Sequence, residues 1–152
     1  MFLGQLGHPA QIYRTQAVLK DLEKKGYKVN VIAKDTANWQ PDEAQQKMDA
    51  WLNAYKGKFN LILANNDAMA LGAVESLITA KYVDDPANPT KDVDGDGTFL
   101  KVPVIGVDAT QVALRSMSEN KLYATVLQDA AGQATTAFDL AYTMATKGAV
   151  NG

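Results

Sequence analysis

Five polar or aromatic residues stand just beyond the apolar runs that we expect to be strands. They are His8, Trp39, Asn66, Asp108 and Gln128. Short side-chain oxygens at such places commonly cap the following helix, so any single asparagine or aspartate has an ordinary structural explanation. Helix capping does not explain why histidine, tryptophan and glutamine also stand at these positions. The whole set suits a polyhydroxylated ligand, because amides and carboxylates hydrogen-bond to hydroxyl groups and an aromatic face packs on C–H groups.

The same residues do not suggest catalysis. No nucleophile stands at an obvious spacing from a base, and no second carboxylate is within obvious reach of Asp108. Gly4 and Gly7 are too close together to form a dinucleotide-binding fingerprint. We therefore expect a binding protein that is not an enzyme and requires no cofactor.

Arg14 follows His8 by about one and a half helical turns. An arginine beside Gln11 and Lys20 is commonly solvated. Its guanidinium fork could instead donate to two ring or hydroxyl oxygens of a ligand. Both interpretations of Arg14 remain open at this stage.

An acidic loop between the third helix and the fourth strand has the pattern of a cation site. Asp92, Asp94 and Asp96 occupy the first, third and fifth positions of an EF-hand-like loop, and Gly97 occupies the sixth. The twelfth position, which usually carries a bidentate acid, is Pro103. The loop is therefore either a weak Ca²⁺ site or a solvated turn.

Composition excludes several classes of function. The chain has 152 residues, a formal net charge of -2, one histidine and no cysteine. A multi-histidine zinc site, thiolate chemistry and disulfides are therefore absent, and the charge gives no reason to expect nucleic acid as a partner. No apolar run is long enough to insert into a membrane, and Met1–Gly4 is too short to begin a signal peptide.

Hydrophobic periodicity predicts five alternating strands and helices, with residues 1–152 forming a single domain. The predicted strands are Phe2–Leu6, Val29–Ala33, Phe59–Ala64, Val102–Val107 and Tyr123–Leu127. The predicted helices are Ala10–Lys25, Asp42–Tyr55, Asp67–Lys81, Ala109–Asn120 and Ala130–Lys147. Regular βα alternation implies an α/β fold with a doubly wound parallel five-stranded sheet and helices on both faces.

Several segments resemble one lobe of a known family. They are Gly7-His8-Pro9 with Arg14, Lys47–Leu52, Ala64–Ala70, Gly106–Ala109, Thr125–Asp129 and Phe138–Ala141. Together these look like the C-terminal lobe of bacterial periplasmic D-galactose/D-glucose-binding proteins, which have the type I periplasmic-binding fold. The resemblance covers nearly the whole chain apart from the acidic loop.

The resemblance implies a two-lobed sugar receptor whose hexose ligand, of the glucose/galactose type, lies between the lobes. It implies that such a protein is the periplasmic component of an ABC importer, with the permease and a chemoreceptor as partners. An N-terminal lobe would supply the other half of the site, and the matching segments do not include it. The positions that match the family's sugar ligands are His8, Arg14, Trp39, Asn66, Asp108 and Gln128.

The chain departs from the family pattern at three places. A ligand aspartate two residues after the histidine is Ala10 here, and a ligand asparagine is Gln128, which carries the same amide on a longer stem. The family's calcium loop precedes the first strand, and its remote glutamate corresponds to Asn60.

Two other classes share this architecture. One is the effector-binding core of a sugar-responsive transcription regulator, for which the sequence offers no DNA-binding helix pair or basic patch. The other is an α/β enzyme, which would need a nucleophile–base pair or a phosphate loop. We therefore expect a sugar-binding lobe.

Overall fold

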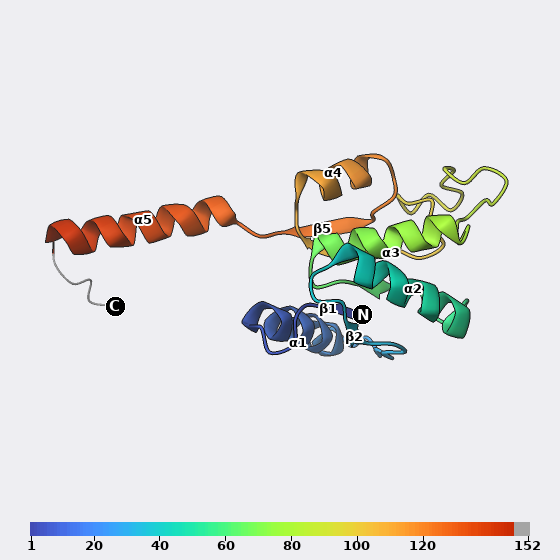
Figure 1. Cartoon of the computed structure of the whole chain (residues 1–152), viewed down its shortest axis with the longest axis horizontal. Coiled ribbons are helices and arrows are strands. Elements are labelled where there is room, and N and C mark those ends of the chain that lie inside the picture. Colours follow the sequence, from blue (N-terminus) through green and yellow to red (C-terminus); the bar gives the residue numbers. More distant parts are fainter. Residues whose placement is uncertain (148–152) are drawn as a thin grey trace.

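The computed structural model describes residues 1–147, in which five strands alternate with five helices (Figure 1). The strands are β1 (Phe2–Leu3), β2 (Asp35–Thr36), β3 (Ile62–Leu63), β4 (Val104–Asp108) and β5 (Ala124–Leu127). The helices are α1 (Pro9–Lys24), α2 (Pro41–Tyr55), α3 (Asp67–Thr79), α4 (Gln111–Ser118) and α5 (Ala130–Lys147). The predicted alternation is confirmed, although the strands are shorter than predicted.

All strand pairs are parallel. β1 pairs with β2, and β3, β4 and β5 form a second ladder in that order. A parallel bridge between Phe2 and Ala64 joins the two ladders, and the Asn65 amide donates to the Phe2 carbonyl at 3.0 Å. The resulting order, 2-1-3-4-5, is a doubly wound sheet whose direction of winding reverses between β1 and β3. In such sheets, ligands bind outside the carboxyl ends of the strands near that reversal.

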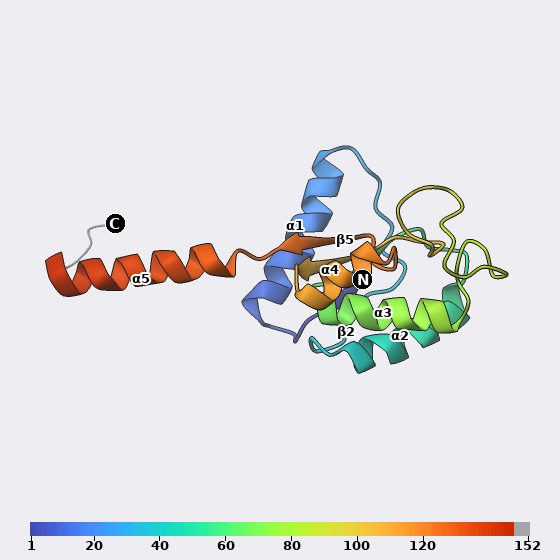
Figure 2. The same cartoon turned by 90° about the horizontal axis from the view of Figure 1, so that it is seen from above.

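Helices cover both faces of the sheet, as predicted. α2 and α3 lie side by side on one face, and α1 lies on the other (Figure 2). α4 packs beside α3. Fully buried Phe2, Met48, Met69, Leu77 and Val104 form the centre of the core between the sheet and this helical layer.

The predicted position of the second strand is wrong. The structure places β2 at Asp35–Thr36, where Phe2 pairs with Asp35 and Leu3 with Thr36. Residues 27–34 have no ladder partner, and Val29 and Val31 are exposed. The alternating apolar pattern of this segment predicts extended backbone, but it does not determine which residues reach the pairing register opposite β1.

The inward face of α1 also differs from the prediction. The sequence pattern predicts four residues directed to the core: Tyr13, Ala17, Leu19 and Leu22. The structure leaves Tyr13 and Ala17 exposed and Leu19 and Leu22 half-buried, and it buries Gln11 and Thr15 instead. The Thr15 hydroxyl donates to Asn65 Oδ1 at 3.2 Å. Because α1 is held by polar contacts at the edge of the sheet, its hydrophobic pattern does not identify its buried face.

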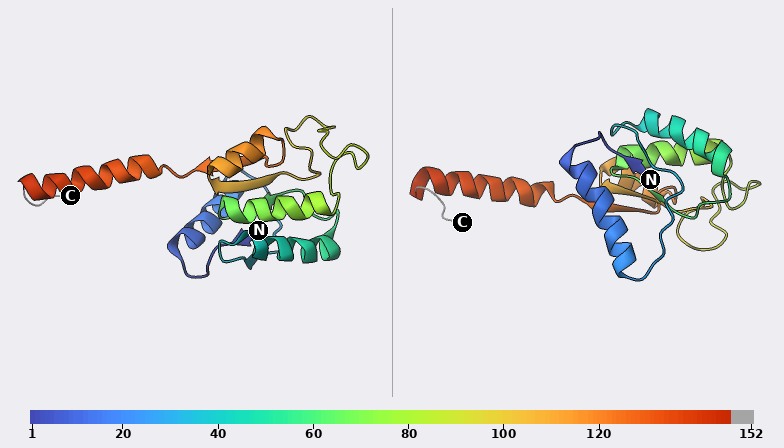
Figure 3. Two further views of the ribbon diagram at one scale, coloured as in Figure 1. Left: turned by 45° about the horizontal axis from the view of Figure 1, so that its top comes forward. Right: turned by 90° about the horizontal axis from the view of Figure 1, so that it is seen from below.

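α5 extends away from the rest of the domain (Figures 1 and 3). None of its residues is buried, and Phe138, Leu140, Tyr142 and Met144 present large apolar side chains to solvent. No helix within residues 1–147 is both long enough and apolar enough to cross a membrane. The helix therefore contributes little to the core of the domain.

We expect a chain that ends at Asp129 to melt cooperatively and at nearly the same temperature as the parent. Since α5 buries no side chain, its loss should shift Tm by no more than about 3 °C, which about 1 kcal/mol produces in a domain of this size. Circular dichroism at 222 nm measures both the melt and the loss of helical signal. Leu77→Ala, which opens a cavity in the core, is the positive control and should cost about 2–5 kcal/mol. A non-cooperative melt of the shortened chain would show that the domain depends on α5.

Candidate ligand-binding site

The six residues predicted to bind a ligand lie at the carboxyl edge of the sheet, on five different segments. His8 caps α1, Arg14 lies in the second turn of that helix, and Trp39 stands in the loop between β2 and α2. Asn66 caps α3, Asp108 ends β4 and Gln128 follows β5. The parallel sheet explains this convergence, because all its strands end at the same edge. Contacts link all six into one cluster, described next.

Arg14 is the centre of this cluster. Its Nη2 lies 2.9 Å from Asp108 Oδ1 and donates to Gln128 Oε1 at 2.5 Å. Its Nη1 donates to the carbonyl of Asn65 at 2.6 Å. The guanidinium therefore joins the ends of β3, β4 and β5, and the interpretation of Arg14 as a merely solvated residue is wrong.

Trp39 forms one wall of the site. Its ring lies 5.9 Å from Arg14 Cζ and makes an edge-to-face contact with His8, with 5.4 Å between ring centroids and 78° between planes. Asn38 and Trp39 both have positive φ, at 50° and 69°. A Cβ on Gly4 would overlap the indole, so this glycine leaves the space that the ring occupies.

Capping accounts for part of the predicted set. Asn66 Oδ1 accepts from the Met69 amide at 3.0 Å and His8 Nδ1 accepts from the Ala10 amide at 3.1 Å, so both side chains cap helices. Asn66 Nδ2 also donates to the Trp39 carbonyl at 3.3 Å. Asp108 is different, because Thr110 caps the helix that follows it. Its carboxylate is therefore free of any capping role.

The Asp108 carboxylate is partly withdrawn from water, with 28% of its side chain exposed. Burial raises the pKa of this carboxyl above its ordinary value, the Arg14 guanidinium opposes that shift, and the charge of Asp67 adds to it. One oxygen contacts Arg14. The site thus combines a half-buried acceptor, an arginine donor, two amides and an aromatic wall, a combination suited to ring hydroxyls.

Five side chains that support the site were missed by the sequence analysis: Thr15, Asn65, Asp67, Thr110 and Thr125. Asn65 Oδ1 accepts from the Gly4 amide and from the Thr15 hydroxyl, at 3.1 and 3.2 Å. The buried carboxylate of Asp67 accepts from Thr110 and Thr125. The only signal for these contacts in the sequence is the run Asn65-Asn66-Asp67 directly after a buried strand.

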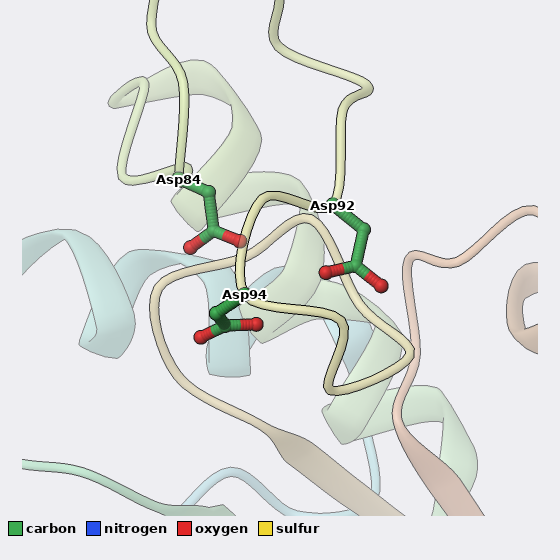
Figure 4. A group of neighbouring side chains, drawn as sticks. All are labelled: Asp84, Asp92 and Asp94. Carbon is green, nitrogen blue, oxygen red and sulfur yellow. The ribbon is translucent and has the colours of Figure 1, made fainter.

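The acidic loop gathers a different trio from the one predicted. Carboxylate oxygens of Asp84, Asp92 and Asp94 all lie within 4.8 Å of one another (Figure 4). Asp96 is not part of this trio, and its Oδ1 accepts from the Thr98 amide at 2.8 Å. The pKa of Asp96 is raised, first by burial and then by the charges of the neighbouring aspartates, against the Thr98 hydrogen bond. Backbone amides also donate to Asp92 and Asp94.

We expect at most weak Ca²⁺ binding in this loop. A site with a Kd near 10⁻³ M would raise Tm by about 3–6 °C in roughly 10 mM calcium, because the bound cation relieves repulsion among the three carboxylates. Asp94→Ala should remove the shift, whereas Asp139→Ala on the exposed α5 should not. Differential scanning fluorimetry measures the shift. A parent Tm that does not respond to calcium leaves the solvated-turn interpretation.

Comparison with known proteins identifies the family. Residues 1–149 match the model of the periplasmic binding protein domain, and the chain belongs to this family. The resemblance recognised in the sequence is thereby confirmed.

Individual relatives agree. The chain is 36% identical over 131 residues to the D-galactose/methyl-galactoside binding periplasmic protein of Haemophilus influenzae, covering 86% of this chain and 34% of that protein. A solute-binding protein of an ABC transporter from Bacillus halodurans, solved with bound myo-inositol, superposes with a TM-score of 0.74 at 36% identity, covering 95% of this chain and 44% of that one. The myo-inositol binding protein of Caulobacter, solved with bound myo-inositol, superposes with a TM-score of 0.79 at 28% identity. The match covers 98% of this chain and 46% of that one. The chain thus spans less than half the length of each of these proteins.

Proposed function

We propose that this chain forms one lobe of a periplasmic solute-binding protein that delivers a hexose to an ABC importer. The observation that carries the proposal is the cluster in which Arg14 joins Asp108 and Gln128 beside the face of Trp39. Hydroxyl groups of a ring can donate to the carboxylate and accept from the arginine, while the C–H face of the ring packs on the indole. The family and the relatives support this proposal.

The ligand class follows from the chemistry of the cluster. Its donors and acceptors suit any ring with neighbouring hydroxyls, and the relatives named above bind galactosides or myo-inositol. We propose a hexose of the glucose/galactose type. Myo-inositol is the competing ligand, because the family's aspartate after the histidine is Ala10 here and an acceptor for the sugar is lost.

A second lobe is part of the proposal. The cluster lies open at the edge of the sheet, with Arg14 and Asp108 each partly exposed, so a ligand bound here keeps one face in solvent. The exposed apolar side chains of α5 offer a surface on which another body could pack. We propose that a second lobe covers the ligand, and that the permease and a chemoreceptor recognise the two-lobed protein.

Nuclear magnetic resonance on the chain itself tests the proposal. Adding D-glucose, D-galactose or myo-inositol, each to about 200 mM, suits the weak affinity expected of half a cleft. The Trp39 indole N–H and the amides beside Asn66 and Asp108 should shift in a saturable way. The Trp51 indole, which packs on Phe2 with 4.5 Å between ring centroids, is the internal control and should not shift. Shifts confined to other surfaces, or none with any of the three ligands, would reject the site.

The affinity should depend on pH through Asp108. Burial raises the pKa of this carboxyl, so it takes up a proton at a higher pH than an ordinary aspartate does. The ionised form is the better acceptor for hydroxyl groups. Affinity should therefore fall as the pH is lowered through the raised pKa and stay constant above it. Asp108→Asn should remove this dependence, and an unchanged profile in that variant would assign the titration to another group.

A further inference from the structure

Asp67 is a buried carboxylate that, within residues 1–147, accepts no hydrogen bond from a predicted ligand-binding side chain. It is the first residue of α3 and is only 1% exposed. Asn66 already caps this helix, so Asp67 is not needed for that purpose. Its oxygens instead accept three hydrogen bonds from the start of α4 and from β5. The donors are the Thr110 amide at 2.8 Å, the Thr110 hydroxyl at 3.0 Å and the Thr125 hydroxyl at 2.5 Å.

These contacts surround an unusual turn. Asp108 and Ala109 have φ angles of 124° and 56°, in a region that L residues rarely adopt. Such backbone persists only where the surroundings fix it. The Ala109 amide donates to Thr125 Oγ1 at 3.1 Å, and the Thr125 hydroxyl donates in turn to Asp67. The amides of the two residues that follow Asp108 are therefore both held by Asp67, one directly and one through Thr125.

Gly106 provides the space that the Asp67 carboxylate occupies. A Cβ on Gly106 would overlap Asp67 Oδ1, although its backbone has no positive φ that would require glycine. The glycine in the middle of β4 therefore provides the space in which the carboxylate lies against the strand. Thr125, the second residue of β5, reaches the same carboxylate from the neighbouring strand.

We infer that Asp67 is a positioning residue of the ligand site: through Thr110 and Thr125 it fixes the Asp108–Ala109 turn and thereby directs the Asp108 carboxylate toward Arg14. The inference rests on the proposed function for its consequence in binding, but the geometry it describes exists without a ligand. Three segments that carry ligand-site residues, the start of α3 and the ends of β4 and β5, meet at this one carboxylate.

Two pairs of variants separate positioning from simple stability. Thr125→Val removes the hydroxyl that links Ala109 to Asp67 and leaves every charge in place, and Thr125→Ser restores the hydroxyl. Asp67→Asn removes the charge and turns one of the two acceptor oxygens into a donor, so that the side chain no longer accepts on both sides. Ser76→Ala is the control, because it removes a hydroxyl that donates to a carboxylate elsewhere: Ser76 is buried on α3 and donates to Asp49, outside the ligand-site cluster.

The first measurement needs no ligand. Amide hydrogen exchange in the parent should show Ala109 and Thr110 protected. In Thr125→Val, Ala109 should exchange about tenfold faster relative to core amides such as that of Leu77, and in Asp67→Asn both amides should do so. Thr125→Ser should resemble the parent. If Ala109 and Thr110 change only in proportion to the core in every variant, the two amides are not held by Asp67 and the inference is wrong.

The second measurement is ligand binding by the same chemical-shift titration. Thr125→Val and Asp67→Asn should weaken binding about tenfold, whereas Thr125→Ser and Ser76→Ala should bind like the parent even where their Tm is lower. A lower Tm with unchanged affinity in Thr125→Val would assign the network a structural role only. If the parent binds none of the three ligands, the proposed function fails, and the exchange experiment still decides whether Asp67 holds the turn. Should Asp67→Asn fail to fold, the two Thr125 variants carry the test.

Discussion

Asp108→Ala is expected to weaken hexose binding by about a hundredfold or more, the largest effect of any single substitution in the site. An ionised carboxylate that accepts from two hydroxyls makes charge-assisted hydrogen bonds, each contributing about 1.5–3 kcal/mol. The substitution also leaves the Arg14 guanidinium without its counterion. Asn66→Ala and Gln128→Ala remove neutral amides and should each cost about tenfold or less.

The comparison is best made in a two-lobed protein, in which the second lobe of a similar sugar-binding protein is joined to this one. Tryptophan fluorescence reports the affinity, because the Trp39 ring contacts both His8 and Arg14. Trp51→Phe in the background removes the other indole. The chemical-shift titration of this chain alone gives the same ranking if the two-lobed protein does not fold.

Asp108→Asn is the control for shape. It keeps a side chain of the same size with one acceptor oxygen, but it loses the charge and turns the other oxygen into an NH₂ donor, so its affinity should lie between those of the parent and Asp108→Ala. Normal folding of each variant is checked by its circular dichroism melt. Parent-like binding by a folded Asp108→Ala would mean that the carboxylate does not touch the sugar and that the site lies elsewhere.

The sequence predicted that these candidate residues lie together at one edge of the sheet, because the signal for that grouping was local. Each candidate stands next to an apolar run, and in a parallel sheet every such position belongs to the same edge. The grouping of His8, Trp39, Asn66, Asp108 and Gln128 required only the order of strands and helices. Arg14 was ambiguous, since its three partners are 51, 94 and 114 residues away in the chain and no local pattern reports them.

The sequence failed where polar contacts over long distances determine the structure. α1 buries Thr15, whose partner Asn65 is 50 residues away, so hydrophobic periodicity chose the wrong face. Asp84 joins Asp92 and Asp94 across a loop, although the EF-hand-like spacing pointed to Asp96. In each case the deciding partner lies outside the window in which a spacing pattern can be recognised.

The network of Asp67 is the same kind of feature. Its partners Thr110 and Thr125 follow it by 43 and 58 residues. At its own position the sequence reads as an ordinary acidic residue in the first turn of a helix, where negative charge is favourable in any case. Because this local role already accounts for an acidic residue at position 67, the sequence gives no reason to look for distant partners. The positions of β4 and β5 are needed to see that the Asp67 carboxylate holds the turn after Asp108.

The second large effect concerns the lobe as a whole: this chain alone should bind hexose with a Kd in the millimolar range or weaker. Arg14 and Asp108 remain 21% and 28% exposed, so a bound sugar keeps its outer face in water and exchanges its hydration only in part. Each 1.4 kcal/mol lost costs about tenfold in affinity, and half of the hydrogen bonds together with most of the desolvation amounts to several such steps. Joining a second lobe should therefore tighten binding by about a thousandfold or more.

Titration calorimetry on the chain and on the two-lobed protein measures this difference directly. The Asp108→Ala variant of the two-lobed protein is the control, because its affinity should fall although both lobes are present. This separates the contribution of the cluster from that of closure, since a second lobe that bound sugar by itself would be insensitive to Asp108. Micromolar binding by the single lobe would show that the edge of this sheet already encloses its ligand. In that case α5 would be the first helix to examine as a cover over the ligand, because it is the one helix of residues 1–147 that buries none of its own side chains.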